Sequence, residues 1–248
     1  MSRTGAVRVV VSLLLVAALP ARGDETPIVA DRPGFGESAS VVARYRVQVE
    51  TGASVTWVGG DATVLDAPQA LVRLGLPGSL ELRVGAPDWV DAHESGERTS
   101  GWTDLTLGVK GHVAVHGHDL SLRATAYLPT GSLALTSDRV DPELAVAWSH
   151  SLSGPWSVGA TVSQRWLRRF DDALTSPSLS LGRSLGESAG TFVEYGAVVN
   201  PDSAPVSRFD HGYTWNPGPR TQVDVSLGIV LSRAPTTFFV GAGFCHRF

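Results

Sequence analysis

The sequence predicts an all-β fold, an antiparallel transmembrane β-barrel of the outer-membrane type with about twelve strands, thirteen being the alternative count. Apolar and polar residues alternate in segments of about ten residues, turn residues separate these segments, and no helical period of useful length appears. After residue 23 no apolar run approaches the roughly 20 residues that a membrane-spanning helix requires. A mature chain that enters a membrane must therefore close into a barrel, because only helices and barrels satisfy their backbone groups in lipid.

The first 23 residues have the pattern of a cleavable signal peptide. Arg3 and Arg8 supply the positive region, residues 9–19 are apolar, and small residues precede the expected cleavage site before Asp24. An uncleaved anchor helix is the alternative, but about eleven apolar residues are too few to span a bilayer comfortably. We therefore expect export to the outer membrane of a Gram-negative-type bacterium.

The mature chain is expected to begin with an irregular arm and to continue as a barrel. Residues 24–38 are polar and rich in Pro and Gly, whereas residues 39–248 contain the alternating segments. The first strand is predicted from Val41, with Val47 and Val49 on its apolar face and charged or amide side chains on the other.

Gly and Pro separate the later strands, because they permit or fix turn geometry. The predicted turns are residues 51–52, 77–78, 116–118, 153–155 and 217–219. The polar stretches 88–101 and 201–207 are predicted to be loops.

A soluble β-sandwich would also alternate, but several features favour the barrel. Lys110, Arg123 and Arg165 place charges in mid-strand on the polar faces, and the apolar faces carry almost none. Tryptophans fall near strand ends, as in an interfacial aromatic girdle: Trp57, Trp102, Trp148, Trp156, Trp166 and Trp215. The last strand alternates up to Phe248, which resembles the signal recognised by the barrel assembly machinery.

The segment 31–38 resembles the opening motif of the family named after the MetA pathway of phenol degradation, Asp-Arg-Pro-x-Phe-Thr-Glu-Ser. The matching residues are Asp31, Arg32, Pro33, Phe35, Glu37 and Ser38. Gly36 stands where the family has Thr, which removes a hydroxyl. Residues 71–85, 101–110 and 129–131 are similar to the family's hairpin, next strand and following turn.

The resemblance implies an outer-membrane transporter that passes small hydrophobic or aromatic solutes. Its partners would be outer-membrane lipid, the barrel assembly machinery and those solutes, and we expect a monomer. The alternative is a plugged structural or interaction barrel without transport activity. The arm is expected either to fold into the lumen as a plug, with Arg32 and Glu37 paired to wall charges, or to cap the barrel as a periplasmic tail. We favour the plug.

Charged side chains on the polar faces are expected to line the lumen. They are Arg73, Glu81, Arg83, Asp104, Lys110, Arg123 and Arg165, together with Glu143, Glu194 and Asp224. They would form either a selectivity surface or a network of ion pairs that holds the barrel rigid, since buried charges must be paired in both cases.

The sequence offers no candidate for catalysis, a metal or a cofactor. His112 and His116 would lie about 13 Å apart on a strand, too far to share one ion, and His116 with His118 lacks a third ligand. No Ser is placed with a His and a carboxylate as an activated nucleophile, so an enzyme is not expected. The net charge of −4 without a basic tract argues against nucleic acid as a partner.

Overall fold

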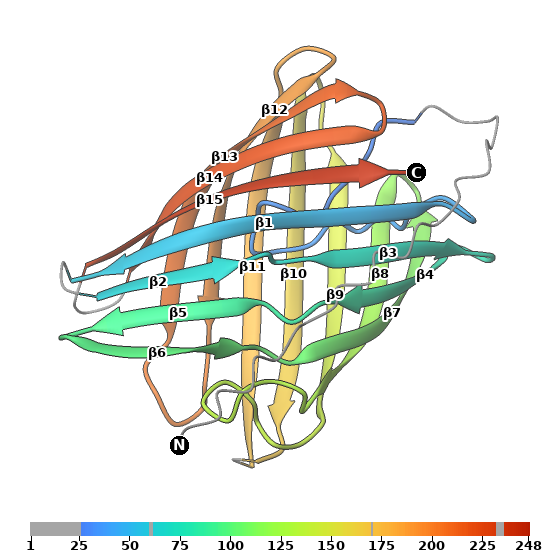
Figure 1. The fold of residues 1–248 in the computed structure, drawn as a ribbon. Coiled ribbons are helices and arrows are strands. Elements are labelled where there is room, and N and C mark those ends of the chain that lie inside the picture. The colour runs from blue at the N-terminus through green and yellow to red at the C-terminus, as the bar shows by residue number, and fades with distance from the viewer. Residues whose placement is uncertain (1–25, 60–61, 170, 232–235) are drawn as a thin grey trace, which may run out of the picture.

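The computed structural model describes residues 26–59, 62–169, 171–231 and 236–248, which form fifteen strands (Figure 1). The predicted signal peptide, residues 1–23, and Asp24 lie outside the described residues. None of the described residues belongs to a helix long and apolar enough to cross a membrane. The strands are β1 (Val47–Val58), β2 (Ala62–Ala67), β3 (Leu71–Leu76), β4 (Leu80–Gly85), β5 (Trp89–Glu94), β6 (Glu97–Trp102), β7 (Leu105–Val115), β8 (His118–Leu128), β9 (Asp141–Ser151), β10 (Trp156–Leu167), β11 (Asp172–Ser184), β12 (Ala189–Val198), β13 (Val206–Gly218), β14 (Thr221–Leu231) and β15 (Thr237–Arg247).

Strand β1 closes the sheet into a barrel. It pairs antiparallel with β15 along nearly its whole length, from Gln48 opposite Arg247 to Val58 opposite Thr237. On its other edge, β3 pairs with the first part of β1 and β2 with the last part. Closure leaves no free edge between the first and last strands, as lipid requires.

Three pairs of named strands each make one barrel strand with a short interruption. Strand β2 continues into β3 through residues 68–70, β4 into β5 through 86–88, and β6 into β7 through 103–104. The halves pair consistently, β3 with β4 and β2 with β5, then β4 with β7 and β5 with β6. The described residues therefore form a closed barrel of twelve antiparallel strands, which confirms the predicted fold.

The two ends of the barrel differ in their connections. One end, called the turn end here, carries short turns such as residues 116–117 and 219–220. The opposite loop end carries longer connections, of which 129–140 and 199–205 are examples. Bacterial outer-membrane barrels have short periplasmic turns and longer extracellular loops, so the turn end corresponds to the periplasm.

Side chains alternate between a polar interior and an apolar exterior. Arg73, Glu81 and Lys110 have no solvent exposure, whereas Leu122 and Val146 expose 59% and 50% of their surface. This is the reverse of a soluble protein, in which large apolar side chains are buried and Lys, Arg and Glu are exposed. The outer face is thus suited to lipid.

Several predicted boundaries are wrong. Residues 51–52 lie inside β1 and make no turn, because Gly52 is a wall position that leaves room for Arg32. Residues 88–101 form most of the β5–β6 hairpin, whose sequence looks like a loop because β6 is exposed on both faces. The barrel begins at Val47, later than predicted.

Candidate functional site

The described part of the arm lies inside the barrel and enters it at the turn end. The Ile28 amide donates to the carbonyl of Pro219 at 2.8 Å, in the turn between β13 and β14. Farther along, the Gln48 side-chain amide on β1 donates to the Val29 carbonyl at 3.0 Å. The arm, blue in Figure 1, therefore follows the inner wall before it turns across the lumen.

Asp31 anchors the arm to the cationic side chains of β3, β4 and β7. Its carboxylate lies 2.7 Å from the Arg83 guanidinium, 3.6 Å from Arg73 and 3.7 Å from the Lys110 ammonium. It also accepts a hydrogen bond from the Ser38 amide at 3.0 Å, which closes residues 31–38 into a loop. Burial alone would raise the pKa of the Asp31 carboxyl, but the charges of Arg73, Lys110 and Arg83 outweigh it and hold that pKa well below its usual range.

Glu37 makes the second anchor. Its carboxylate lies 3.0 Å from Arg123 Nε on β8 and 3.4 Å from Lys110 Nζ. The same ammonium donates to the Ser38 carbonyl at 2.5 Å. Both acidic residues of the motif therefore bind cations that lie on the polar faces of the wall strands, as their alternation predicts.

The wall cations are also paired with wall carboxylates. Arg73 lies 2.9 Å from Glu81 and 2.7 Å from Glu50, and Arg83 lies 2.7 Å from Glu81. On β8 and β9, Arg123 lies 2.7 Å from Glu143. These side chains are at most slightly exposed, so each charge needs the partners it has.

On the opposite wall the arm is held through its backbone. The amides of Phe35 and Gly36 donate to the two carboxylate oxygens of Glu194 on β12, at 2.5 and 2.9 Å. The Glu37 amide donates to the Thr161 hydroxyl on β10 at 3.2 Å. Because Glu37 also binds β7 and β8, residues 35–37 bridge two sides of the barrel.

Phe35 fills a pocket in the wall. Its ring centroid lies 5.5 Å from that of Phe239, and the Arg208 guanidinium lies 3.9 Å from it in a cation–π contact. A Cβ on Gly196 would lie 3.1 Å from the Phe35 ring, so that glycine makes the space for it.

Arg32 occupies a second pocket in the wall, which is lined by glycines. Its guanidinium lies where Cβ atoms on Gly52 and Gly243 would be, and these two glycines pair across β1 and β15. It donates to the Gln69 side-chain carbonyl at 2.8 Å and to the Ala242 carbonyl at 3.1 Å. Such close approach is possible only beside glycine.

The side chains around position 36 explain why this chain has glycine in place of the usual threonine of the motif. A Cβ at position 36 would lie 2.5 Å from the Ser178 hydroxyl, 2.8 Å from Glu194 and 3.0 Å from the Thr161 hydroxyl. Wall side chains thus fill the space that a larger residue would need.

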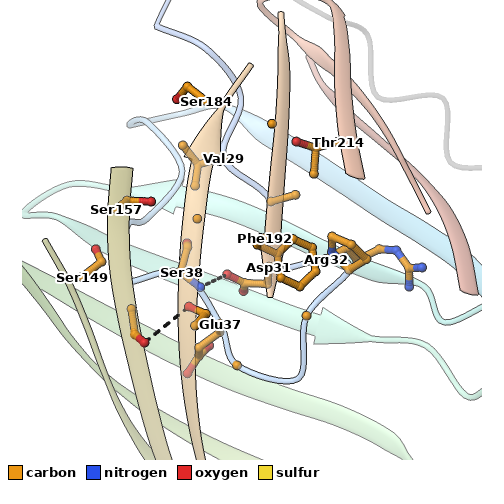
Figure 2. Close-up of a pocket in the computed structure, with 18 of the residues that line it drawn as sticks. Val29, Asp31, Arg32, Glu37, Ser38, Ser149, Ser157, Ser184, Phe192 and Thr214 are labelled. Atoms are coloured by element: carbon orange, nitrogen blue, oxygen red, sulfur yellow. Dashed lines mark hydrogen bonds between the residues drawn. The ribbon is translucent and has the colours of Figure 1, made fainter. Parts of the chain in front are cut away.

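A cavity of about 650 Å³ remains between the arm and the inner faces of β9–β14 (Figure 2). It extends from Gly34 and Ser38 of the arm to the 185–188 turn at the turn end. Small residues make up much of its wall, and the lining also includes the aromatic residues Trp148 and Phe192 and the acidic residues Glu187 and Glu194. In Figure 2, Asp31 and Glu37 of the arm lie beside this space.

Of the remaining predicted residues, Asp104, Arg165 and Phe248 lie away from the arm contacts, whereas the Asp224 carboxylate lies 3.6 Å from the Arg32 guanidinium of the arm. Asp104 accepts the amides of Thr130 and Gly131, at 3.1 and 2.8 Å, and so holds the 129–140 loop. Arg165 lies 3.2 Å from Asp141 near the loop end. Phe248 is half exposed at the end of β15. Pro33 lines the cavity.

Sequence reasoning missed the wall residues that receive the arm, above all Thr161, Arg208 and the glycines. Their period-two spacing does place them on the inner face, since Gly52 follows Glu50 by two residues. The spacing therefore predicts that these residues face the lumen, but not which residue of the arm each one contacts.

A closed barrel with a charged interior, an apolar exterior and an internal cavity belongs to the class of outer-membrane β-barrels. Within that class, the chain is a member of the MetA-pathway of phenol degradation family, whose model matches residues 30–248. Comparison with curated proteins gives no match.

Solved outer-membrane channels share the fold. The COG4313 outer membrane channel from Pseudomonas putida F1 is 16% identical, with a TM-score of 0.66 over 84% of this chain and 97% of that one. The NanC porin is 6% identical, with a TM-score of 0.59 over 80% and 98%. The KdgM porin, in complex with disordered oligogalacturonate, is 9% identical, with a TM-score of 0.58 over 81% and 99%.

Proposed function

We propose that this outer-membrane barrel is a channel for small uncharged solutes, hydrophobic and aromatic ones among them, and that residues 31–38 are its gate. The observation that carries the proposal is the cavity of about 650 Å³, which extends from the turn end along the arm. The arm lines one side of this space and is not part of the barrel wall.

The charges around the arm favour uncharged solutes. Asp31 and Glu37 are paired with wall cations, and both oxygens of Glu194 accept arm amides. Because these groups are already paired, an ion that passed here would lose water without gaining them as partners, which is costly in a confined space. A neutral solute avoids that cost. The family's name, which refers to phenol degradation, agrees with aromatic solutes.

A plugged structural barrel is the second candidate, and the bridge from Glu194 through residues 35–37 to Arg123 favours it. An arm that never leaves would make these ion pairs a rigid interior brace. The two candidates differ in whether solutes cross when the arm is loosened.

The test compares flux through liposomes for wild type, the arm variant Asp31→Asn/Glu37→Gln and the matched control Asp91→Asn/Glu97→Gln on the β5–β6 hairpin. Solutes are phenol, a neutral sugar and potassium chloride. We expect the wild type to pass phenol faster than salt, and the arm variant to raise flux at least about tenfold, because it removes two buried anchors. The control should match wild type. No flux through a correctly inserted barrel, with the arm either held or loosened, would refute the channel and favour the structural role.

A further inference from the structure

Many of the inward-facing residues that line the cavity carry hydroxyl groups. Inward-facing positions of β9, β10, β11 and β13 carry Ser149, Ser151, Ser157, Ser178, Ser180, Ser184 and Thr214. Figure 2 shows four of them, Ser149, Ser157, Ser184 and Thr214, around the space that Phe192 also lines.

Cross-strand glycines keep the space in front of these hydroxyl groups open. Ser157 lies opposite Gly182, and its hydroxyl would be 2.6 Å from a Cβ there. Thr214 lies opposite Gly190, and its hydroxyl would be 3.0 Å from a Cβ. The hydroxyls therefore lie along the wall beside glycines and leave the space in front of them unfilled.

Most of these hydroxyls have no protein partner. Among the described residues, the side chains of Ser157, Ser184 and Thr214 make no hydrogen bond, whereas Ser180 donates to the Gly159 carbonyl at 3.3 Å. Polar groups that lack a protein partner are hydrogen-bonded by water or by a ligand. A solute without polar groups would displace that water and leave the hydroxyls unpaired, but a hydroxylated solute would replace the lost hydrogen bonds.

Phe192 adds a flat apolar surface to the cavity wall. Its ring lies over Gly212 of β13, where a Cβ would overlap it, so the ring lies along the wall. Aromatic rings in this position bind other flat rings by stacking or by contact with ring C–H groups. At about 650 Å³ the cavity is within the usual size of small-molecule sites.

We infer that the cavity is a binding site for uncharged ring molecules that carry hydroxyl groups, and that Ser157, Ser184, Thr214 and Phe192 set this preference. The inference deepens the proposed function, on which its transport aspect rests. Both hydroxylated aromatics and sugars have this chemistry, and bare hydrocarbons do not.

The experiment measures binding first, without transport, by saturation-transfer NMR on the full chain in detergent. The probes are catechol, o-xylene, which has the same shape with methyl groups in place of hydroxyls, and glucose. They are compared in wild type, in Ser157→Ala/Ser184→Ala/Thr214→Val, and in the matched control Thr99→Val/Ser100→Ala on exposed β6. Partition into micelles cancels, because each probe is compared between variants in the same detergent.

We expect the triple variant to weaken catechol binding at least about fivefold, to leave o-xylene binding unchanged or stronger, and to differ from the control, since each hydroxyl contributes a modest hydrogen bond. The single variant Thr214→Val, which preserves shape, should show part of the effect. If glucose binding weakens in parallel with catechol binding, the site accepts sugars as well as hydroxylated aromatics. If glucose does not bind, the site is selective for hydroxylated aromatics. Catechol binding that does not respond to the triple variant would overturn the inference.

Liposome flux of the same probes separates this inference from the proposed function. Binding that depends on the hydroxyls, without any flux even when the arm is loosened by Asp31→Asn/Glu37→Gln, would uphold the site and reject the channel. Flux that ignores the hydroxyls would uphold the channel and reject the site.

Discussion

Replacing Glu37 with Gln tests how firmly the arm is held in the lumen. Only 9% of the Glu37 side chain is exposed, and its carboxylate lies 3.0 Å from Arg123 and 3.4 Å from Lys110. Gln has nearly the same shape but no charge. The variant therefore removes the electrostatic anchor and leaves the packing of the arm in place.

The size of the destabilisation depends on which partners Arg123 and Lys110 keep when Glu37 loses its charge. Loss of one partner of a buried ion pair costs about 3–5 kcal/mol. We expect about 2–3 kcal/mol here, because Arg123 keeps Glu143 at 2.7 Å and Lys110 keeps the Ser38 carbonyl at 2.5 Å. That free energy shifts the equilibrium between the seated and released arm roughly 30- to 150-fold.

Hydrogen exchange with mass spectrometry measures that equilibrium directly. The amides of Phe35, Gly36 and Glu37 are all donated to wall side chains, so release of the arm exposes them to exchange. Their exchange should accelerate by the factor given above, while the strands of the barrel keep their protection. Glu97→Gln, in the exposed β5–β6 hairpin, is the matched control and should change nothing. Arm exchange equal to that of wild type, or an equal acceleration in the strands, would refute the reasoning.

Three further predictions concern the arm and the cavity. Gly52→Ala should accelerate hydrogen exchange of the arm at least about tenfold, because the new Cβ takes the place of the Arg32 guanidinium. The control Gly218→Ala, which has open space around its Cβ, should not change this exchange. Equal effects of the two substitutions would contradict the conclusion that Gly52 makes room for Arg32. Folding lowers the pKa of the Asp31 carboxyl, so its ionised form stabilises the folded state at any pH above the pKa of the unfolded chain. This contribution is lost as the pH falls through the lowered pKa of the folded state. The Asp31 anchor should therefore hold from pH 8 to 5 and weaken only below about pH 4. Loss of arm protection already at pH 6 would argue against this anchor. Gly190→Val should fill part of the cavity and lower phenol flux severalfold, and unchanged flux would mean that solutes do not use it.

The barrel could be predicted from the sequence because its signal is local. A side chain two residues farther along a strand returns to the same face, so alternation gives both the strands and the polarity of each face. Arg73, Glu81 and Lys110 were placed on polar faces by that rule, and all three lie inside. The same rule wrongly predicted a loop at residues 88–101, because a strand exposed on both faces shows no alternation of apolar and polar residues.

Only the tertiary structure decided which polar residues meet. Gly36 and Glu194 are 158 residues apart in the chain, and nothing in their spacing brings the arm amides to that carboxylate. Closure of β1 on β15 places Gly52 and Gly243 side by side and so creates the pocket for Arg32. The sequence by itself determined the strand pattern, the polar inner face and the family motif. The register of twelve paired strands decided the rest, because it alone fixes which inward side chains share a level of the lumen.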